Sequence, residues 1–358
     1  MRIIVEKEYR SFFDEKTGRY MRTGIIRDGA DTGVDPFMGV FPELLDVGIM
    51  GHCRHGRSGL CEKAGVECYQ NGQISTADNM TLHDFRSIAE QCKGKTYQFA
   101  LGGCGDPDQH EAFEDILKIC RDNRIVPNFT TSGLGMTEEK ASICKEYCGA
   151  VAVSWYRSSY TSDAINMLIS TGVKTNIHYV LNRDTIEEAA DRLTDDAGFP
   201  KGINAVVFLL HKPVGQGSRE KMIDLHNDSL RRLLEVVDSP DIHKHPYKIG
   251  FDSCTVPALI GMKRIDPTSL DTCEGARWSA YISADMQMMP CSFAHEHPEW
   301  SVSLRDHTIL EAWNSTEFDL FRDSLLHRCP ECGQRHLCMG GCPVVPDIVL
   351  CERRHDGI

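Results

Sequence analysis

The sequence has no apolar run long enough to span a membrane and few basic residues for its length. Its 358 residues include 39 lysines and arginines against 52 aspartates and glutamates, a formal net charge of −13. Binding of nucleic acid through its phosphates requires a basic face, so we expect no nucleic-acid partner. The first residues, MRIIVEKEYRSFF, carry charges where an export signal would be apolar. We therefore predict a cytoplasmic protein with no membrane partner.

Internal repeats and low-complexity tracts are also missing, and the remaining pattern is that of an α/β protein. Short apolar runs rich in Val, Ile and Phe alternate with segments whose apolar residues recur at helical spacing. Six strands are expected, at residues 44–50, 97–101, 125–131, 150–155, 174–181 and 205–210. Strands that alternate with helices form parallel βαβ units. Six units are fewer than the eight of a closed (β/α)₈ barrel.

The sequence predicts two clear helices in the barrel portion, and its regular periodicity ends near residue 240. One helix is expected in HEAFEDILKICRDN, with one apolar face made by Ala112, Phe113, Ile116, Leu117 and Cys120. Another is expected to begin with a capping box, in which the side chains of Thr185 and Glu188 bond the first backbone amides. A helical stretch at 219–239 closes the barrel portion. We therefore expect an N-terminal cap at 1–43 with a hairpin turn in DEKTGRYMRTG, a barrel portion at 44–240 and a Cys-rich portion at 241–358.

Sixteen cysteines are more than a cytosolic enzyme needs for packing, and in a reducing compartment such a surplus indicates metal. Eight lie in residues 254–351 and three in residues 53–68. Four others fall in helical patterns, where we expect buried, inert thiols: Cys92, Cys120, Cys144 and Cys148.

The C-terminal run CPECGQRHLCMGGCPVVPDIVLC has the most specific spacing, C-x₂-C-x₅-C-x₃-C followed by one more cysteine. A two-residue gap lets two thiolates bind one metal centre from a tight turn. A structural zinc ribbon is one interpretation. Zinc needs only four thiolates, however, and two four-thiolate iron–sulfur clusters would use all eight that this region offers. Those eight are Cys254, Cys273, Cys291, Cys329, Cys332, Cys338, Cys342 and Cys351.

The segment GHCRHGRSGLCEKAGVECYQNG places Cys53, Cys61 and Cys68 directly after the first expected strand. Three thiolates are one short of a closed tetrahedral site. An ordinary surface loop, or a zinc site completed by His52 or His55, is the alternative. The gaps of seven and six residues still allow the thiolates to converge, because loop entropy grows slowly with length. Three glycines give the backbone the freedom to do so: Gly56, Gly59 and Gly65.

The C-terminal motif resembles the SPASM domain of radical S-adenosylmethionine enzymes, and the barrel portion resembles the same superfamily. The resemblance implies a partial (β/α)₆ TIM-like barrel followed by a Cys-rich SPASM-type domain. It also implies one [4Fe–4S] cluster that binds S-adenosylmethionine and two auxiliary [4Fe–4S] clusters. This sequence departs from the family where C-x₇-C-x₆-C replaces C-x₃-C-x₂-C and where Met286 replaces a usual glycine.

Carried over position by position, the resemblance implies a ligand set for each cluster. Cys53, Cys61 and Cys68 would hold the cluster whose fourth position S-adenosylmethionine occupies. The first auxiliary cluster would be held by Cys254, Cys273, Cys291 and Cys342, and the second by Cys329, Cys332, Cys338 and Cys351. Contacts to the cofactor would come from Tyr69, Gly102, Gly103, Asp106, Ser132, Ser154 and Asn176. A core or capping role is the alternative for several of these, and Cys104 is either catalytic or incidental.

The resemblance further implies an oxidoreductase that cleaves S-adenosylmethionine to a 5′-deoxyadenosyl radical and takes hydrogen from a peptide or protein. The preferred substrate is a ribosomally made (RiPP) precursor peptide, on which a maturase forms thioether or carbon–carbon cross-links or epimerises residues. Side-chain oxidation, as in anaerobic sulfatase maturases, is the alternative. An electron donor such as flavodoxin or ferredoxin would be needed. Two other classes stay open: a non-catalytic zinc-ribbon protein, and an iron–sulfur electron carrier that does not use S-adenosylmethionine.

Overall fold

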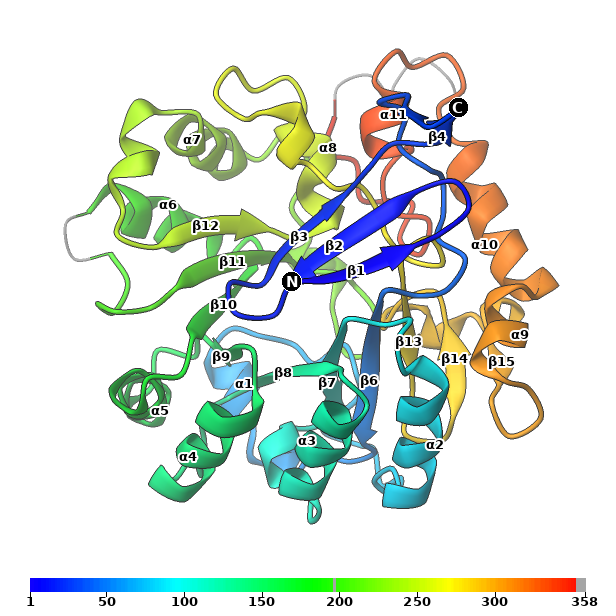
Figure 1. Cartoon of the computed structure of the whole chain (residues 1–358). Coiled ribbons are helices and arrows are strands. Elements are labelled where there is room, and N and C mark those ends of the chain that lie inside the picture. The colour runs from blue at the N-terminus through cyan, green and yellow to red at the C-terminus, as the bar shows by residue number, and fades with distance from the viewer. Residues whose placement is uncertain (196–197, 352–358) are drawn as a thin grey trace.

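A ten-stranded sheet runs through the molecule in the computed structural model, which describes residues 1–195 and 198–351 (Figure 1). Six of its strands follow one another in chain order and pair in parallel, as the sequence predicts. They are β6 (Leu44–Met50), β7 (Gln98–Gly103), β8 (Val126–Thr131), β9 (Val151–Ser154), β10 (Thr175–Leu181) and β11 (Ala205–Leu210). Their carboxyl ends therefore meet at one edge of the sheet.

Four further strands come from beyond residue 240. β12 (Lys248–Phe251) pairs in parallel with β11, and β13 (Ser279–Ile282) pairs in parallel with β6 on the other side. β14 (Gln287–Met289) and β15 (Val302–Ser303) continue from β13 in antiparallel fashion. Among the described strands β12 pairs only with β11, so the curved sheet does not close. The boundary near residue 240 stays a prediction, and the same sheet holds strands from both sides of it.

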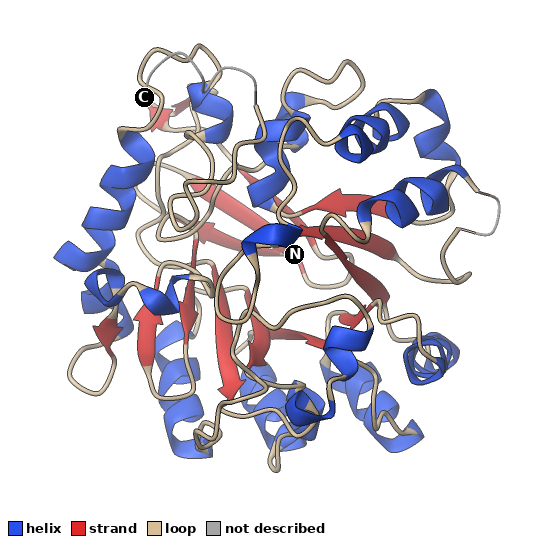
Figure 2. Cartoon of the chain, turned by 180° about the vertical axis from the view of Figure 1, so that it is seen from behind, coloured by secondary structure: helices blue, strands red, loops and turns tan. Residues whose placement is uncertain are grey.

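Helices cover the outer face of this partial barrel (Figures 1 and 2). Residues that point outward under them, such as Leu45, Val47 and Ile177, are fully buried, whereas their neighbours along each strand stay partly exposed inside the curve. The helices are α2 (Leu82–Cys92), α3 (Phe113–Asp122), α4 (Glu138–Tyr147), α5 (Ser159–Thr171), α6 (Ile186–Thr194) and α7 (Asp228–Val237). The interior of the curve is thus available for a site.

The predicted helical details are partly right. On α3, Phe113, Ile116, Leu117 and Cys120 are buried as expected. The stretch expected to be helical at 219–239 forms α7 only from Asp228, because the side chain of Asn227 caps the first turn. Of the four thiols expected to be buried, those of Cys92, Cys120 and Cys144 are, and that of Cys148 is half-buried.

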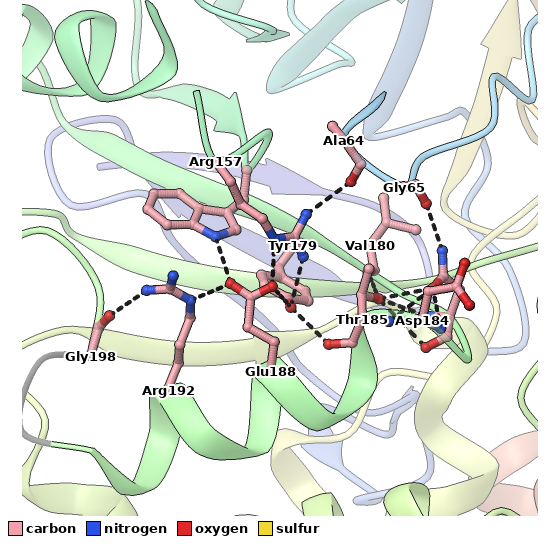
Figure 3. A network of polar contacts seen from close by, with 12 residues as sticks. Ala64, Gly65, Arg157, Tyr179, Val180, Asp184, Thr185, Glu188, Arg192 and Gly198 are labelled. Carbon is pink, nitrogen blue, oxygen red and sulfur yellow. Dashed lines mark hydrogen bonds and ion pairs between the residues drawn. The ribbon is translucent and has the colours of Figure 1, made fainter. Parts of the chain in front are cut away.

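The capping box predicted at the start of α6 is wrong. The Thr185 hydroxyl donates to the Val180 carbonyl over 2.7 Å and makes no cap bond to the helix. The Glu188 carboxylate turns away to accept from the guanidinium groups of Arg157 and Arg192 (Figure 3). Ion pairs with two arginines are stronger than one bond to a terminal amide, so tertiary contacts override the local motif.

The N-terminal residues form a small antiparallel sheet across the amino ends of the barrel strands (Figure 1). It contains β1 (Arg2–Val5), β2 (Arg10–Asp14) and β3 (Arg19–Arg22), and the predicted hairpin between β2 and β3 is confirmed. The Ser11 hydroxyl donates to Glu43 over 2.7 Å and lies 3.0 Å from the Tyr97 hydroxyl. A two-stranded ribbon, β4 (Ile26–Arg27) and β5 (Ala30–Asp31), follows.

The C-terminal part packs into the same core as the barrel. Trp313, Phe318 and Phe321 are fully buried in one cluster with the strand residues of β6 to β11. They lie on α9 (Ile309–Trp313) and α10 (Thr316–Leu326), and the short helices α8 (Val256–Leu259) and α11 (Arg335–Cys338) carry or flank cysteines. In the described ranges we find no helix with the length and apolarity to cross a membrane.

Candidate metal-cluster sites

The loop after β6 brings its three cysteines together despite their spacing. A turn at Gly56–Ser58 and the short helix α1 (Leu60–Lys63) take up the residues between them. All three thiols are half-buried. Burial raises the pKa of the Cys53 thiol to about 11, and the negative charges of Asp106, Cys61 and Cys68 add to the rise, which places all of them near one another. The backbone of Gly59 and Gly65, on either side of α1, has positive φ, as the turn requires.

The end of this loop closes over the thiols through Gly72. Its N–H donates to Cys68 Sγ over 3.3 Å. A Cβ at this position would lie 3.2 Å from Cys68 Sγ, 3.2 Å from Cys53 Cβ and 2.8 Å from the Cys104 carbonyl oxygen. Only glycine lets the backbone approach this closely. The bond from Gly72 therefore fixes the position of the Cys68 sulfur beside Cys53.

The middle of the loop is held by the barrel wall (Figure 3). Arg157, which follows β9, donates to the Ala64 carbonyl over 2.9 Å, and Asn182 donates to the Gly65 carbonyl over 3.0 Å. Glu188 of α6 forms ion pairs with Arg157 and with Arg192. The stretch of six residues between Cys61 and Cys68 is therefore a folded segment with fixed partners.

The glycine-rich loop after β7 packs against this loop. A Cβ on Gly103 would lie 2.3 Å from the Met50 carbonyl oxygen, and one on Gly105 would lie 2.7 Å from the His52 carbonyl oxygen. Gly102, in contrast, faces open space, with no atom within 4 Å of such a Cβ. The Cys104 thiol donates to the Gln70 carbonyl over 2.8 Å, so it ties the two loops together.

Asp106 joins the next strand end to the site. Its carboxylate accepts from the Ser132 amide over 2.9 Å and from the Ser132 hydroxyl over 2.5 Å. Burial raises the pKa of Asp106, and the bonds from Ser132 oppose that rise. The nearby His55 Nε2 is buried and has no hydrogen-bond partner within the described part of the chain. A buried nitrogen without a partner fits a site that receives a polar ligand.

Tyr156, from the loop after β9, is a site residue that the sequence reasoning did not identify. Its hydroxyl is hydrogen-bonded to the Cys61 sulfur, and burial raises its pKa well above the ordinary value. The available signal was an aromatic residue two positions beyond the end of the fourth strand. The loops after four consecutive strands, β6 to β9, thus supply Cys53, Asp106, Ser132 and Tyr156 to one place.

The other predicted cofactor contacts lie elsewhere in the interior. Ser154 pairs in register with His178, whose ring lies 3.1 Å from the Thr130 hydroxyl. Asn176 lies at the second position of β10 and accepts from Asn204 over 2.7 Å, so the structure does not bring it to the carboxyl edge. The Tyr69 ring packs against that of Phe293 in a tilted arrangement, with centroids 4.5 Å apart.

A second set of thiols gathers between the barrel and the C-terminal part. Cys254 and Cys342 are hydrogen-bonded to each other, which raises the pKa of Cys254 and lowers that of Cys342. Burial raises the pKa values of Cys273 and Cys291 to about 12 each, and both lie within electrostatic reach of Cys254. The structure therefore brings together the four residues that the sequence assigns to the first auxiliary cluster.

The third set lines a small pocket near the C-terminus of the described chain. Cys329, Cys332, Cys338 and Cys351 face it, with Ile348 and Leu350 among the apolar residues around them. Across residues 1–195 and 198–351, no three His, Cys, Asp or Glu side chains are close enough to hold one metal ion. A cluster accepts thiolates at separate irons and so at wider spacing than a single zinc ion does. The wide spacing of these thiols, and not their number, therefore fits clusters better than a single zinc ion.

No family model matches the sequence, and no curated protein matches it. Solved structures do share its fold. Streptococcus suis SuiB bound to S-adenosylmethionine aligns over 88% of this chain and 78% of its own, with 16% identity and a TM-score of 0.67. SuiB bound to precursor peptide SuiA aligns over 89% and 77%, with 17% identity and a TM-score of 0.68. Native anSMEcpe with bound AdoMet and Cp18Cys peptide aligns over 85% and 89%, with 17% identity and a TM-score of 0.60. The predicted fold class is therefore confirmed.

Proposed function

We propose that this chain, which shares the fold of SuiB and anSMEcpe, is a radical S-adenosylmethionine enzyme that acts on a peptide or protein. The observation that carries the proposal is the gathering of Cys53, Cys61 and Cys68 at the carboxyl edge of the parallel sheet. Ligands in such folds bind at that edge. The three thiols lie against the glycine loop after β7, and two further sets of four thiols follow in the chain.

Cys53, Cys61 and Cys68 would hold a [4Fe–4S] cluster with one open iron. When bound, this cluster supplies the electron that cleaves S-adenosylmethionine to a 5′-deoxyadenosyl radical. The chain's own contribution is placement. Tyr156 orients the Cys61 sulfur, Gly72 donates to the Cys68 sulfur, and the open face of Gly102 leaves room for the cofactor. Asp106 and Ser132 hold the two neighbouring loops in a fixed relation.

A peptide substrate is supported by the solved structures with this fold, since SuiB binds precursor peptide SuiA and anSMEcpe binds a Cp18Cys peptide. We propose cross-linking or epimerisation of a precursor peptide as the reaction. Oxidation of a peptide side chain is the second candidate, because the anSMEcpe complex aligns over nearly as much of this chain as SuiB does. Flavodoxin or ferredoxin would supply the electron, and the chain would work in the cytoplasm.

Replacing Cys53, Cys61 and Cys68 together by alanine tests the proposal. Anaerobically reconstituted wild-type protein should contain iron and sulfide and, when reduced, should convert S-adenosylmethionine to 5′-deoxyadenosine. The triple variant should lose that conversion by at least about 100-fold, because the ligands of the cluster are gone, and should keep the iron of the two C-terminal sets. Iron analysis and chromatography of 5′-deoxyadenosine measure both.

The matched control is Cys148→Ala, which removes a half-buried thiol at the end of α4 and away from all three sets. It should retain both iron and activity. A wild-type protein with stoichiometric zinc and no sulfide would support a zinc-ribbon protein instead. A reduced cluster that yields no 5′-deoxyadenosine would support an electron carrier, and cleavage that survives in the triple variant would show that the ligands are elsewhere.

A further inference from the structure

Lys212, on the loop after β11, is a buried cation that the reaction described above does not use. Its side chain is only 1% exposed. The Nζ atom donates to the Leu210 carbonyl over 3.2 Å and to Asp252 Oδ2 over 3.1 Å, and it lies 4.1 Å from the centroid of the Phe293 ring. Removing an ammonium from water costs several kcal/mol, so a lysine at this depth needs strong compensating contacts.

This ammonium lies beside the first auxiliary set, since its partner Asp252 is two residues before Cys254 and its neighbour Phe293 is two residues after Cys291. Lys212 lies within electrostatic reach of Cys254, Cys342 and Cys291. Its aromatic neighbour Phe293 is two residues beyond Cys291 and packs against the ring of Tyr69, which follows Cys68. The side chain of Gln70 also donates to the Ser292 carbonyl over 3.2 Å. Lys212 therefore lies beside the contact between the loop that carries Cys68 and the segment that follows Cys291.

Asp252 does not cancel the charge of Lys212 at these thiols. Its carboxylate is 18% exposed and is shared among three donors, since it also accepts from the Leu210 amide over 3.1 Å and the Thr255 hydroxyl over 2.6 Å. The negative charge of Asp252 acts on Cys254, but the positive charge of Lys212 acts more strongly there. Lys212 also acts on Cys342 and Cys291. The charge of Lys212 therefore acts on three thiols of the set and exceeds that of Asp252 at Cys254.

We propose that Lys212 is a positioning residue whose fixed charge raises the reduction potential of the cluster that Cys254, Cys273, Cys291 and Cys342 would hold. The inference rests on the proposed function, because it assumes that these thiols bind a cluster. Four thiolates make such a centre negative, and reduction adds one more negative charge. A cation held nearby in a medium of low dielectric constant stabilises the reduced form more than the oxidised form.

The experiment compares Lys212→Met with Lys212→Arg in the full-length, anaerobically reconstituted protein. The probe is a potentiometric titration followed by electron paramagnetic resonance, and the signal of this cluster is identified by its loss in Cys273→Ala. Lys212→Met should shift that midpoint to a more negative potential and leave the other clusters unchanged. Lys212→Arg keeps the positive charge, so its midpoint should stay close to the wild-type value. Lys263→Met removes an exposed lysine and should change nothing.

A second variant keeps the test decisive if Lys212→Met fails to take up iron. Asp252→Asn removes the negative charge and leaves one oxygen to accept the bonds from Leu210 and Lys212, and it should shift the midpoint in the positive direction. If Lys212→Met takes up iron, an unchanged midpoint would overturn the inference. If it holds no cluster, an unchanged midpoint in Asp252→Asn would overturn it. Failure of the proposed function gives different results: a zinc-ribbon protein has no iron or signal for Cys273→Ala to remove, and an electron carrier has the signal but forms no 5′-deoxyadenosine.

Discussion

At the scale of single residues, Asp46 illustrates how the barrel interior differs from a packed core. It lies on β6 and points inside the curved sheet, beside its register partner Tyr281. Burial raises the pKa of Asp46 to about 7. A carboxyl in such a place is more often functional than structural, since a core would exclude it. Asp46 lies on the inner face of β6, and the open barrel explains why it is tolerated there.

Asp46→Asn should change the pH dependence of stability. The folded pKa lies above the unfolded value of about 3.9, so between these values the folded protein keeps a proton that the unfolded chain has lost. Wild-type stability should therefore fall as pH rises through this window, by at most about 1.4 kcal/mol per pH unit. Asparagine resembles the protonated form and removes this dependence.

Urea unfolding of the cluster-free protein at pH 5, 6 and 7 measures this effect. The stability of Asp46→Asn relative to wild type should increase at each step. A difference that stays constant across the three pH values would show that the Asp46 carboxyl has an ordinary pKa in the folded protein.

At the scale of elements, α6 acts as the support of the loop that carries the first three cysteines. Glu188 of α6 holds Arg157, and Arg157 holds the carbonyl of Ala64 at the end of α1 (Figure 3). The sequence motif at the start of α6 predicts a local cap, and nothing local indicates an arginine 31 residues earlier. The contacts of Glu188 with Arg157, and of Arg157 with Ala64, thus explain both how the long gap between Cys61 and Cys68 is held and why the predicted cap does not form.

Glu188→Gln should loosen this loop without unfolding the protein. The amide keeps the shape but loses two ion pairs, at a cost of about 1–2 kcal/mol in the free energy of unfolding. Hydrogen exchange at residues 60–68 should become at least several-fold faster. Glu187→Gln is the matched control, because its exposed carboxylate pairs with Arg232 on the outer surface and does not contact the loop. Equal exchange in the two variants would show that Glu188 does not support the loop.

At the scale of the whole molecule, the barrel and the Cys-rich part share one core. β13 pairs with β6, the Trp313 indole donates to the Gly39 carbonyl over 2.9 Å, and Arg305 forms a two-bond ion pair with Asp84 of α2. The loss of regular apolar periodicity near residue 240 predicts where the βα units end. It does not predict that later strands return to both edges of the same sheet.

We therefore expect the cluster-free chain to unfold in urea as one unit. Far-ultraviolet circular dichroism and hydrogen exchange at β10 and at α10 should give coincident midpoints, because buried contacts join the barrel to the Cys-rich part. Two separated transitions, with α10 unfolding first, would show instead that the Cys-rich part is an independent domain.

The sequence by itself determined the six parallel strands, the thiol-rich character of the chain and the place of Cys53, Cys61 and Cys68 after the first strand. These follow from apolar periodicity and composition, which are local properties of the chain. Only the tertiary structure decided that Tyr156, Asp46 and Lys212 lie near the thiols or inside the barrel. Those contacts join residues far apart in sequence, and they exist only once the strands have paired and curved, because no local pattern records the curvature of a sheet.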